Sequence, residues 1–553
     1  MSKTPNRWIG LVFISMAISL VIIDGTIVNT IFPSIIKDLR LSSTEVQWVQ
    51  ESYVLVFASL LLVWGTIGDR IGRRRLLIIG IFIFTAASIW AGFSTDAPSM
   101  ILARIVQGIG GAMVLPTTLS LVNATFQGKE RGIAFAIWGS TIGGMVAVGP
   151  VLGGWLATDF DWRWAFNINA PLGLIIIIGL LIFATESKQS QREGRIDWVG
   201  AGISVIMFST LVFGLIEGRA YGWWNVNPAN QFAIGDFKWP TTGISVIPVS
   251  LAIFVIATVV FVLWERSREK AQKNVILDLG LFHIGSFRNG SIAAGIISMG
   301  EFGLLFAIPL WLQNVQGLSP VSSGLVLLWL AGGAFLASGV GGALSGKLSA
   351  VNAVRIGVLL ELIAVAGIAF IASTSGGWQG IAPFLAVYGV GVGLATAQLT
   401  GVIMTDVPMT KAGQASGSQS TVRQIGSALG IAVLGTVLFT ATQASIETRI
   451  VDLPALSVLD QPTRQVLAEQ IAKPVSDSAG AAIPAIPQFL TSQGMPQAVA
   501  EEVTVAAADG FTDGMKATGW AAAIFLLLGL ASTINLGGKT KREKKAAKAK
   551  ADA

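Results

Sequence analysis

The chain of 553 residues contains no cysteine and only one histidine, His283. Without thiols, the sequence excludes disulfides, thiol catalysis, iron–sulfur clusters and thiolate zinc sites. A single imidazole cannot build a histidine metal site, and no G-x-x-x-x-G-K-[ST] loop is present to bind ATP phosphates. The sequence therefore predicts no metal, no cofactor and no direct drive by ATP.

Charge is also scarce, since 12% of the residues are charged and 53% are hydrophobic. A soluble domain carries about 25% charged residues. The mean hydropathy of +0.69 implies more apolar surface than one water-soluble core can hide, so lipid is the expected solvent. Because the apolar runs are long and continuous, and not ten-residue alternations, they predict helices and not barrel strands. The expected class is an all-α integral membrane protein.

Fourteen stretches approach the length of about 20 mostly apolar residues that a spanning helix needs. One long connection, 443–516, separates the last two of them and contains nine acidic and four basic residues. We expect it to form amphipathic helix over the outer mouth or to be disordered. The predicted spans are 8–32, 45–68, 76–95, 98–126, 132–157, 163–185, 197–217, 242–264, 288–313, 320–346, 353–374, 380–404, 417–442 and 517–537.

The distribution of basic residues predicts the orientation. If both termini are cytoplasmic, the cytoplasmic segments hold about three times as many of the 37 Lys and Arg residues as the outer ones. The net charge of +6 therefore reflects topology and not nucleic-acid binding. The basic tail 539–553 is expected to lie near anionic lipid. We expect a multi-pass protein of the plasma (inner) membrane.

Two stretches suggest an internal repeat. "RIVQGIGGAMV" (104–114) aligns with "VYGVGVGLATA" (387–397) when Gly108 is placed opposite Gly391, which puts Val387 opposite Arg104. The second copy keeps the small residues that allow close helix packing and lacks the charge. We therefore interpret Arg104 as functional.

The repeat divides the chain into four parts. Two pseudo-symmetric six-helix halves, related by an axis along the membrane normal, are a known transporter plan with the substrate site between them. The predicted parts are an N-terminal half 1–196, an inserted helix pair 197–273, a C-terminal half 274–538 that includes 443–516, and the tail 539–553.

The most specific motif is "GTIGDRIGRRRL" (65–76) at the cytoplasmic end of the second span. Its glycines allow a close approach and a tight turn, and its aspartate can accept from a helix N-terminus or an arginine. The alternative is that the arginines only enforce topology. The predicted gating residues are Gly65, Asp69, Arg70, Gly72, Arg73 and Arg74.

This motif resembles the loop signature of the major facilitator superfamily. "LARIVQGIGGA" (102–112) is similar to the span-4 motif of that family, which contains a buried arginine. "MVAVGPVLGG" (145–154) resembles its span-5 antiporter motif, with Met145 in place of a glycine. The matching residues are Gly149, Pro150, Gly153 and Gly154.

"DGTIVNTIFP" (24–33) narrows the resemblance to the 14-helix drug:proton antiporter branch, which the chain resembles throughout except in 443–516 and the tail. The resemblance implies a proton-coupled exporter of lipophilic, cationic drugs that works by alternating access. The implied partners are a small lipophilic substrate, protons and the lipid bilayer, and the chain is expected to be a monomer.

Three charged residues are predicted at a similar depth in the N-terminal half. At about 1.5 Å per residue, Asp24 lies roughly 24 Å from the cytoplasmic start of its span. Glu51 and Arg104 lie roughly 9 Å below the outer starts of theirs. We expect one titratable cluster in which Arg104 stabilises one carboxylate and burial favours protonation of the other. The alternatives are helix packing for Asp24 and Arg104, and wetting by outside water for Glu51.

Glu301 lies roughly 20 Å into the first span of the C-terminal half. As the counterpart of Asp24, it is a second candidate for proton binding or recognition of a cationic drug. Its alternative role is a packing or gate hydrogen bond. We expect Glu361 to reach the membrane surface or pair with Arg355, and Arg423 to lie at the cytoplasmic gate.

Two other classes of function remain open at this stage. The same scaffold could export a lipid, a fatty acid or a metabolite, or import its cargo. A non-transport envelope scaffold or receptor would need none of the buried charges. A membrane-embedded enzyme is not expected, because the sequence offers no paired nucleophile and base.

Overall fold

The apolar stretches form long helices, because backbone N–H and C=O groups in lipid must be satisfied within their own segment. The computed structural model describes residues 6–41, 43–187, 196–228, 230–234, 237–344 and 348–536. The predicted basic tail 539–553 lies outside these ranges.

The first part of the chain is helical up to Phe183. Its helices are α1 (Arg7–Leu39), α2 (Ser43–Ile71), α3 (Arg73–Gly92), α4 (Ala97–Thr125), α5 (Gly128–Asp159), α6 (Trp164–Asn167) and α7 (Asn169–Phe183). The next part contains α8 (Trp198–Ile216), α9 (Gly218–Tyr221), the antiparallel pair β1 (Ala233–Ile234) and β2 (Phe237–Lys238), and α10 (Val246–Lys270).

The last part begins with a short 3-10 helix and is again helical. It comprises η1 (Leu279–His283), α11 (Gly285–Asn314), α12 (Pro320–Leu344), α13 (Ala350–Ile371), η2 (Trp378–Gly380), α14 (Ala382–Ile403), η3 (Met409–Lys411), α15 (Ala412–Val451), η4 (Pro454–Leu456), α16 (Gln461–Asp477), η5 (Ile483–Ala485), α17 (Ile486–Ser492), α18 (Gln497–Ser532) and η6 (Thr533–Leu536).

Thirteen helices of the described part of the chain are long and apolar enough to cross a membrane. The all-α membrane class is therefore confirmed. α5 is not among the thirteen, although its 32 residues include the predicted span 132–157. Some side chains of α5 lie outside the described residues, so the number fourteen stays a prediction.

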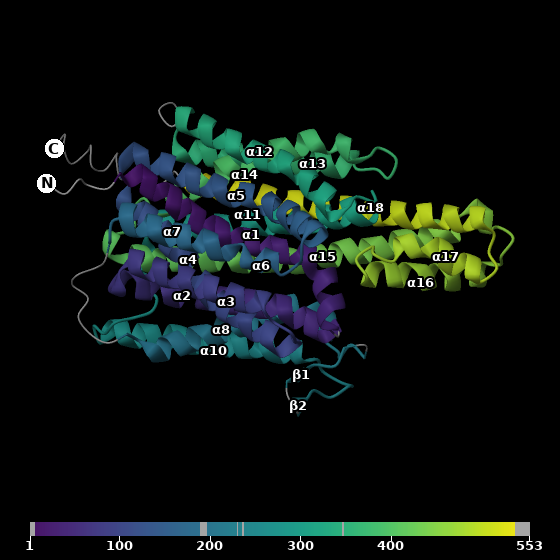
Figure 1. Ribbon diagram of the computed structural model, residues 1–553, viewed down its shortest axis with the longest axis horizontal. Coiled ribbons are helices and arrows are strands. Elements are labelled where there is room, and N and C mark those ends of the chain that lie inside the picture. Colours follow the sequence, from purple (N-terminus) through teal and green to yellow (C-terminus); the bar gives the residue numbers. More distant parts are fainter. Residues whose placement is uncertain are drawn as a thin grey trace.

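The helices run side by side, with α8 and α10 along one side of the bundle (Figure 1). α2 packs against α15, and α5 packs against α12 and α14, so these helices join the early part of the chain to the late part. α8 packs on α2 and α10 packs on α8. We call the end where α1 begins and α2 ends the basal end, and the opposite end the distal end.

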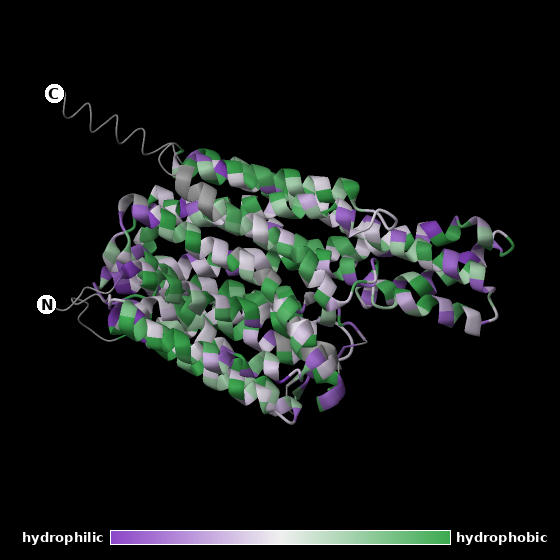
Figure 2. Cartoon of the chain, turned by 45° about the horizontal axis from the view of Figure 1, so that its top comes forward, coloured by the Kyte–Doolittle hydropathy of each residue, from purple (hydrophilic) through white to green (hydrophobic). Residues whose placement is uncertain are grey.

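Apolar residues face outward along the sides of this bundle. Phe82, Leu174 and Ile256 are among the large hydrophobic residues with more than half of their surface exposed. Figure 2 shows hydrophobic residues over the sides, and hydrophilic residues gathered at the basal end and on the distal projection. This pattern suits a lipid-facing surface bounded by two aqueous ones.

The connection 443–516 is a helical projection, so of the two expectations for it the helical one is correct. α15 and α18 continue beyond the other helices at the distal end, where α16 and α17 pack against them (Figure 1). Buried apolar side chains such as Ile450, Leu467, Ile471 and Val503 give this projection a core. The periodic apolar residues of 461–477 therefore bury against α15 and do not cover the mouth of the bundle.

The structure contains the internal repeat, because α3 packs on α4 as α13 packs on α14. The predicted alignment of its glycines was wrong by two residues. A Cβ on Gly110 would overlap Phe84 and Gly80 of α3, and a Cβ on Gly391 would overlap Glu361 and Gly357 of α13. The correct pairing therefore places Gly110, and not Gly108, opposite Gly391. Each repeat has several glycines two residues apart, so the sequence alone permits the slip.

Adjacent glycines of α12 give a matched test of the packing. A Cβ on Gly333 would overlap the carbonyl oxygen of Ala386, whereas a Cβ on Gly332 would meet nothing within 4 Å. We expect Gly333→Ala to lower the free energy of unfolding by about 1–3 kcal/mol through overpacking. Gly332→Ala should be neutral or stabilising, because alanine is the better helix former. Thermal unfolding of both purified variants checks this, and equal melting temperatures would contradict it.

Candidate functional site

Asp24 and Arg104 form a buried ion pair at the centre of the early helices. Asp24 is 1% exposed and Arg104 is 2% exposed. Arg104 Nη1 donates to Asp24 Oδ2 at 2.7 Å. Gln107 Nε2 and Asn169 Nδ2 donate to Asp24 Oδ1 at 2.7 and 3.2 Å, and the guanidinium lies over the ring of Tyr53, 4.3 Å from its centroid. The structure thus brings together two of the three residues that the sequence placed at one depth.

Glu51 does not join this pair, so its predicted place in the cluster was wrong. Its carboxyl group instead faces that of Glu217, across the interface between α2 and the end of α8. The cause is helix geometry: Val49 and Tyr53, four residues apart, both face Arg104. The residue midway between them points to the opposite side of α2. The estimated depth of Glu51 was therefore correct, but depth alone does not predict which face of α2 carries its side chain.

A second group of charges, in which Glu301 and Glu361 are buried and Arg423 is 20% exposed, lies among α11, α13, α14 and α15. Glu301 is 3% exposed, and its Oε2 lies 3.6 Å from Arg423 Nη2. Arg423 also donates to Thr396 Oγ1 at 3.5 Å. Glu361 is 0% exposed and interacts electrostatically with both Glu301 and Arg423.

The expectations for Glu361 and Arg423 are corrected by this arrangement. Arg355 donates to the backbone carbonyl oxygens of Thr533 and Ile534 and does not pair with Glu361. Glu361 lies six residues further along α13, where the helix face turns inward, and is fully buried. Arg423 lies beside Glu301 inside the bundle. The sequence does hold a signal for this group. Glu301, Glu361 and Arg423 each have no other charged residue within one helical turn, so their partners must come from other helices.

The basal contact between α2 and α15 is built from the "GTIGDRIGRR" motif. A Cβ on Gly65 would overlap the carbonyl oxygen of Gly413, so the two backbones touch there. The Gly413 N–H donates to Asp69 Oδ1 and Oδ2 at 3.0 and 2.9 Å. Arg73 Nη2 donates to Asp69 Oδ1 at 2.7 Å and to the carbonyl oxygen of Met409 at 3.1 Å. These contacts join the two halves of the chain at the basal end.

The other motif residues shape the turn between α2 and α3. Gly72 has φ of +111°, which favours glycine, and a Cβ there would lie 2.8 Å from the Glu186 carboxylate. Glu186 accepts from the backbone N–H of Arg74 at 3.0 Å, and Arg74 Nη1 donates to the carbonyl oxygen of Ala184 at 2.9 Å. Arg70 lies half-buried in the last turn of α2. The turn is thereby fixed to the segment that follows α7.

The α5 motif packs that helix between α1 and α12. A Cβ on Gly149 would overlap the hydroxyl oxygen of Thr26, and a Cβ on Gly153 would lie 2.8 Å from Ile27 Cγ1. A Cβ on Gly154 would overlap Val321 of α12, and Pro150, inside α5, lies against Gly324 of the same helix. The motif therefore holds the turn of α1 that directly follows Asp24.

The basal contact can be tested without any assay of function, because a chain free of cysteine accepts a single reporter. Ser420 is buried on the face of α15 that carries Gly413 and Gly417. In Ser420→Cys protein, we expect Asp69→Asn to raise the rate of maleimide labelling about tenfold, because hydrogen bonds to a charged group contribute about 1.5–3 kcal/mol. Labelling of the purified protein followed by mass spectrometry measures this rate.

Arg75→Gln is the matched control, because the Arg75 side chain is 70% exposed and 3.9 Å from Glu186. It should leave the labelling rate unchanged. A rate that is the same in the Asp69→Asn and Arg75→Gln backgrounds would show that Asp69 does not hold the basal end closed.

Comparisons with known proteins agree with this geometry. Residues 14–431 match the model of the Major Facilitator Superfamily. The multidrug efflux pump LfrA of Mycolicibacterium smegmatis is 30% identical over 543 residues, 95% of each chain. The tetracenomycin C resistance and export protein of Streptomyces glaucescens is 31% identical over 433 residues, 78% of this chain and 76% of the relative.

Among solved structures, the human organic anion transporter MFSD10 (TETRAN) matches with a TM-score of 0.56 and 10% identity, over 94% of this chain and 100% of that one. A bacterial homologue of the human lysosomal transporter Spinster, in an inward-facing and unoccupied conformation, matches with a TM-score of 0.51 and 17% identity, over 97% and 99%. These likenesses establish the fold. With the family match across most of its length, the chain belongs to the Major Facilitator Superfamily.

Proposed function

We propose that the protein is a proton-coupled secondary transporter that exports lipophilic, cationic drugs by alternating access. The observation that carries this proposal is the pair of buried charge groups, one in each half of the bundle. Asp24 and Arg104 face each other at 2.7 Å, and Glu301 lies 3.6 Å from Arg423. Ionisable groups at membrane depth are costly and mark ion or substrate pathways.

The basal contact supplies the conformational part of the mechanism. Asp69, Gly413 and Arg73 join the two halves at the basal end, and the α5 motif packs α5 along α12. Breaking the basal contact lets the halves rock about the α5–α12 packing, which is how transporters with paired repeats expose a central site to each side in turn. Protonation of a buried carboxylate weakens its ion pair, and this couples the rocking to the proton gradient.

The relatives support export of drugs as the direction and cargo. Both curated relatives described above carry names that refer to efflux or export, and one of them is named as a multidrug pump. Anionic side chains near the bundle centre suit a cationic cargo, because an ionised carboxylate attracts it. The excess of Lys and Arg at the basal end supports a cytoplasmic position for that end. We assign the protein to the plasma membrane, as a monomer with cytoplasmic termini.

Transport in inverted membrane vesicles tests the proposal. With the vesicle interior acidified, wild-type protein should accumulate ethidium and release protons from the interior. Asp24→Asn should abolish accumulation, because it leaves a buried arginine without its carboxylate at a cost of about 3–5 kcal/mol. Glu301→Gln should reduce it at least about tenfold, since the loss of a buried charge partner is worth more than 1.4 kcal/mol. Dye fluorescence and a pH-sensitive probe measure the two fluxes.

The double variant Asp24→Asn/Arg104→Gln restores neutrality and controls for misfolding. It should recover the thermal stability of the wild type and still fail to accumulate dye. If Asp24→Asn and Glu301→Gln both exchange dye for protons at wild-type rates, the proposed function is wrong. A wild-type protein that moves no dye under a proton gradient would also refute the proposal.

A further inference from the structure

The two halves of the bundle differ at one repeat-equivalent position. Gly80 and Gly110 bring α3 and α4 together beside Phe84, and Gly357 and Gly391 bring α13 and α14 together in the same way beside Glu361. Phe84 is 0% exposed and so is Glu361. An apolar ring fills this place in one half, so the fold itself does not require a carboxylate there.

The two halves also differ in their balance of charge. In the early half, Asp24 is matched by Arg104 and accepts two further hydrogen bonds from Gln107 and Asn169. In the late half, Glu301 pairs with Arg423 at 3.6 Å, and Glu361 interacts electrostatically with both of them. With all three ionised, the late group would hold a net charge of −1 in a buried site, and an unmatched buried ion costs several kcal/mol.

In the described part of the chain, several carboxyl oxygens of the late group lack a hydrogen-bond partner, so one of them could carry a proton. Among the described residues, Oε1 of Glu301 and both carboxyl oxygens of Glu361 are buried without a hydrogen-bond partner. These side chains are 3% and 0% exposed. Carboxyl oxygens this deeply buried are usually hydrogen-bonded. A proton on one of the two carboxyl groups would remove the net charge.

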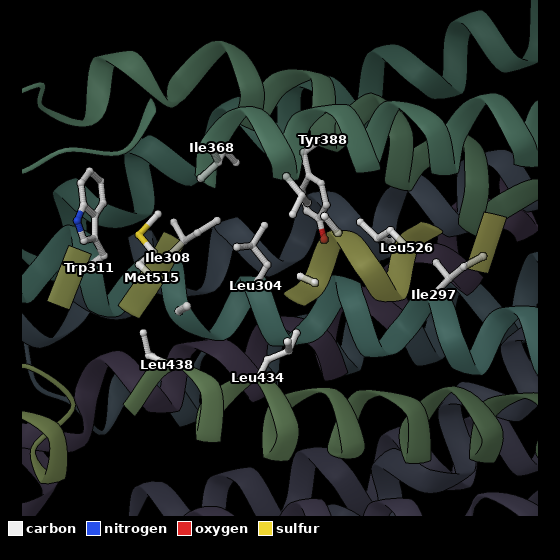
Figure 3. Close-up of a cluster of buried hydrophobic side chains, with 14 of the residues drawn as sticks. Ile297, Leu304, Ile308, Trp311, Ile368, Tyr388, Leu434, Leu438, Met515 and Leu526 are labelled. Carbon is white, nitrogen blue, oxygen red and sulfur yellow. The ribbon is translucent and has the colours of Figure 1, made fainter. Parts of the chain in front are cut away.

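The helices around this group present mostly uncharged side chains to it. α14 contributes Tyr388, whose hydroxyl donates to the backbone carbonyl oxygen of Glu301 at 3.2 Å, and Thr396. α15 contributes Arg423, while α18 presents Leu526 and Ala522 against Gly300. Figure 3 shows Tyr388 reaching from α14 toward α11, among apolar side chains that include Leu304 and Leu526. Within the described residues, Arg423 is thus the cation that faces the two carboxyl groups.

We propose that Glu301 and Glu361 hold one proton between them, and that this proton is the one exchanged during transport, while Asp24 keeps its contact with Arg104. An O–H bond forms on one of the two carboxylates with a proton from water on one side of the membrane. The same bond breaks when the proton leaves to water on the other side, and Arg423 then stabilises the remaining charge. This inference rests on the proposed function and names the site of its proton.

Carbodiimide labelling tests the proton directly, because dicyclohexylcarbodiimide reacts with protonated carboxyl groups that are shielded from water. In wild-type protein in liposomes, we expect labelling at Glu301 or Glu361, and none at Asp24. In Glu361→Gln protein, one carboxylate and one arginine remain and form a neutral pair. Labelling of Glu301 should then fall about tenfold, because a neighbouring arginine favours the ionised carboxylate. Peptide mass spectrometry locates and quantifies the adducts.

Two transport measurements, ethidium exchange without a gradient and accumulation driven by the proton gradient, distinguish failure of this inference from failure of the proposed function. Glu361→Gln should keep ethidium exchange between equal pools, which needs no gradient, and should lose accumulation driven by the proton gradient. Glu502→Gln, on the exposed surface of the projection, is the matched control and should keep both. Retained exchange also shows that the variant is folded.

Two results would overturn the inference. The first is wild-type proton coupling in Glu361→Gln protein, and the second is labelling of Glu301 that is unchanged by this substitution. Either result leaves the proposed function standing as long as wild-type protein accumulates dye. If Glu361→Gln loses gradient-free exchange as well, Glu361→Phe, which copies Phe84, decides between packing and proton binding. Restored exchange without coupling supports the proposal, whereas exchange with full coupling, or no exchange at all, refutes it.

Discussion

The cost of an ionised group in a low-dielectric interior is the constraint on which the rest of this structure depends. It explains why Asp24 is matched by Arg104, and why Gln107 and Asn169 are drawn in from α4 and α7. It also explains the placement of the α5 glycines. They hold α5 against the turn of α1 that carries Asp24, so that water is kept from the pair. Packing that looks like simple helix contact is therefore part of the electrostatic design.

The same constraint acts differently on the two halves, although their helices pair in the same way. Equivalent glycines set equivalent distances between α3 and α4 and between α13 and α14. What differs is the chemistry placed on that common frame, with an aromatic ring at Phe84 and a carboxyl group at Glu361. A duplicated scaffold can thus carry a matched ion pair in one half, and two carboxyl groups with one arginine in the other. Asymmetry between repeats is more informative about function here than their likeness.

Much of this could be predicted from the sequence, and the failures have physical causes. Apolar run length predicted the helices, and an aspartate and an arginine at one depth predicted the Asp24–Arg104 contact, because helix rise is constant. The face of a helix is harder, since an error of one or two residues turns a side chain by 100° or more. Glu51 and the slipped glycine repeat failed for this reason. Glu361 failed because burial depends on which neighbours surround α13, and no local pattern in 350–371 records that.

If the late half rocks as proposed, the distal projection moves further than the rest of that half. α15 is one unbroken helix of 40 residues, so it spans about 60 Å and carries the charge group, the basal contact and the projection on a single rod. α18 runs beside it for much of that length and stiffens it. A lever of this length tilted by roughly 10° displaces its far end by about 10 Å, given the helix rise. The tip of the projection therefore moves much further than the buried carboxylates do for the same rotation.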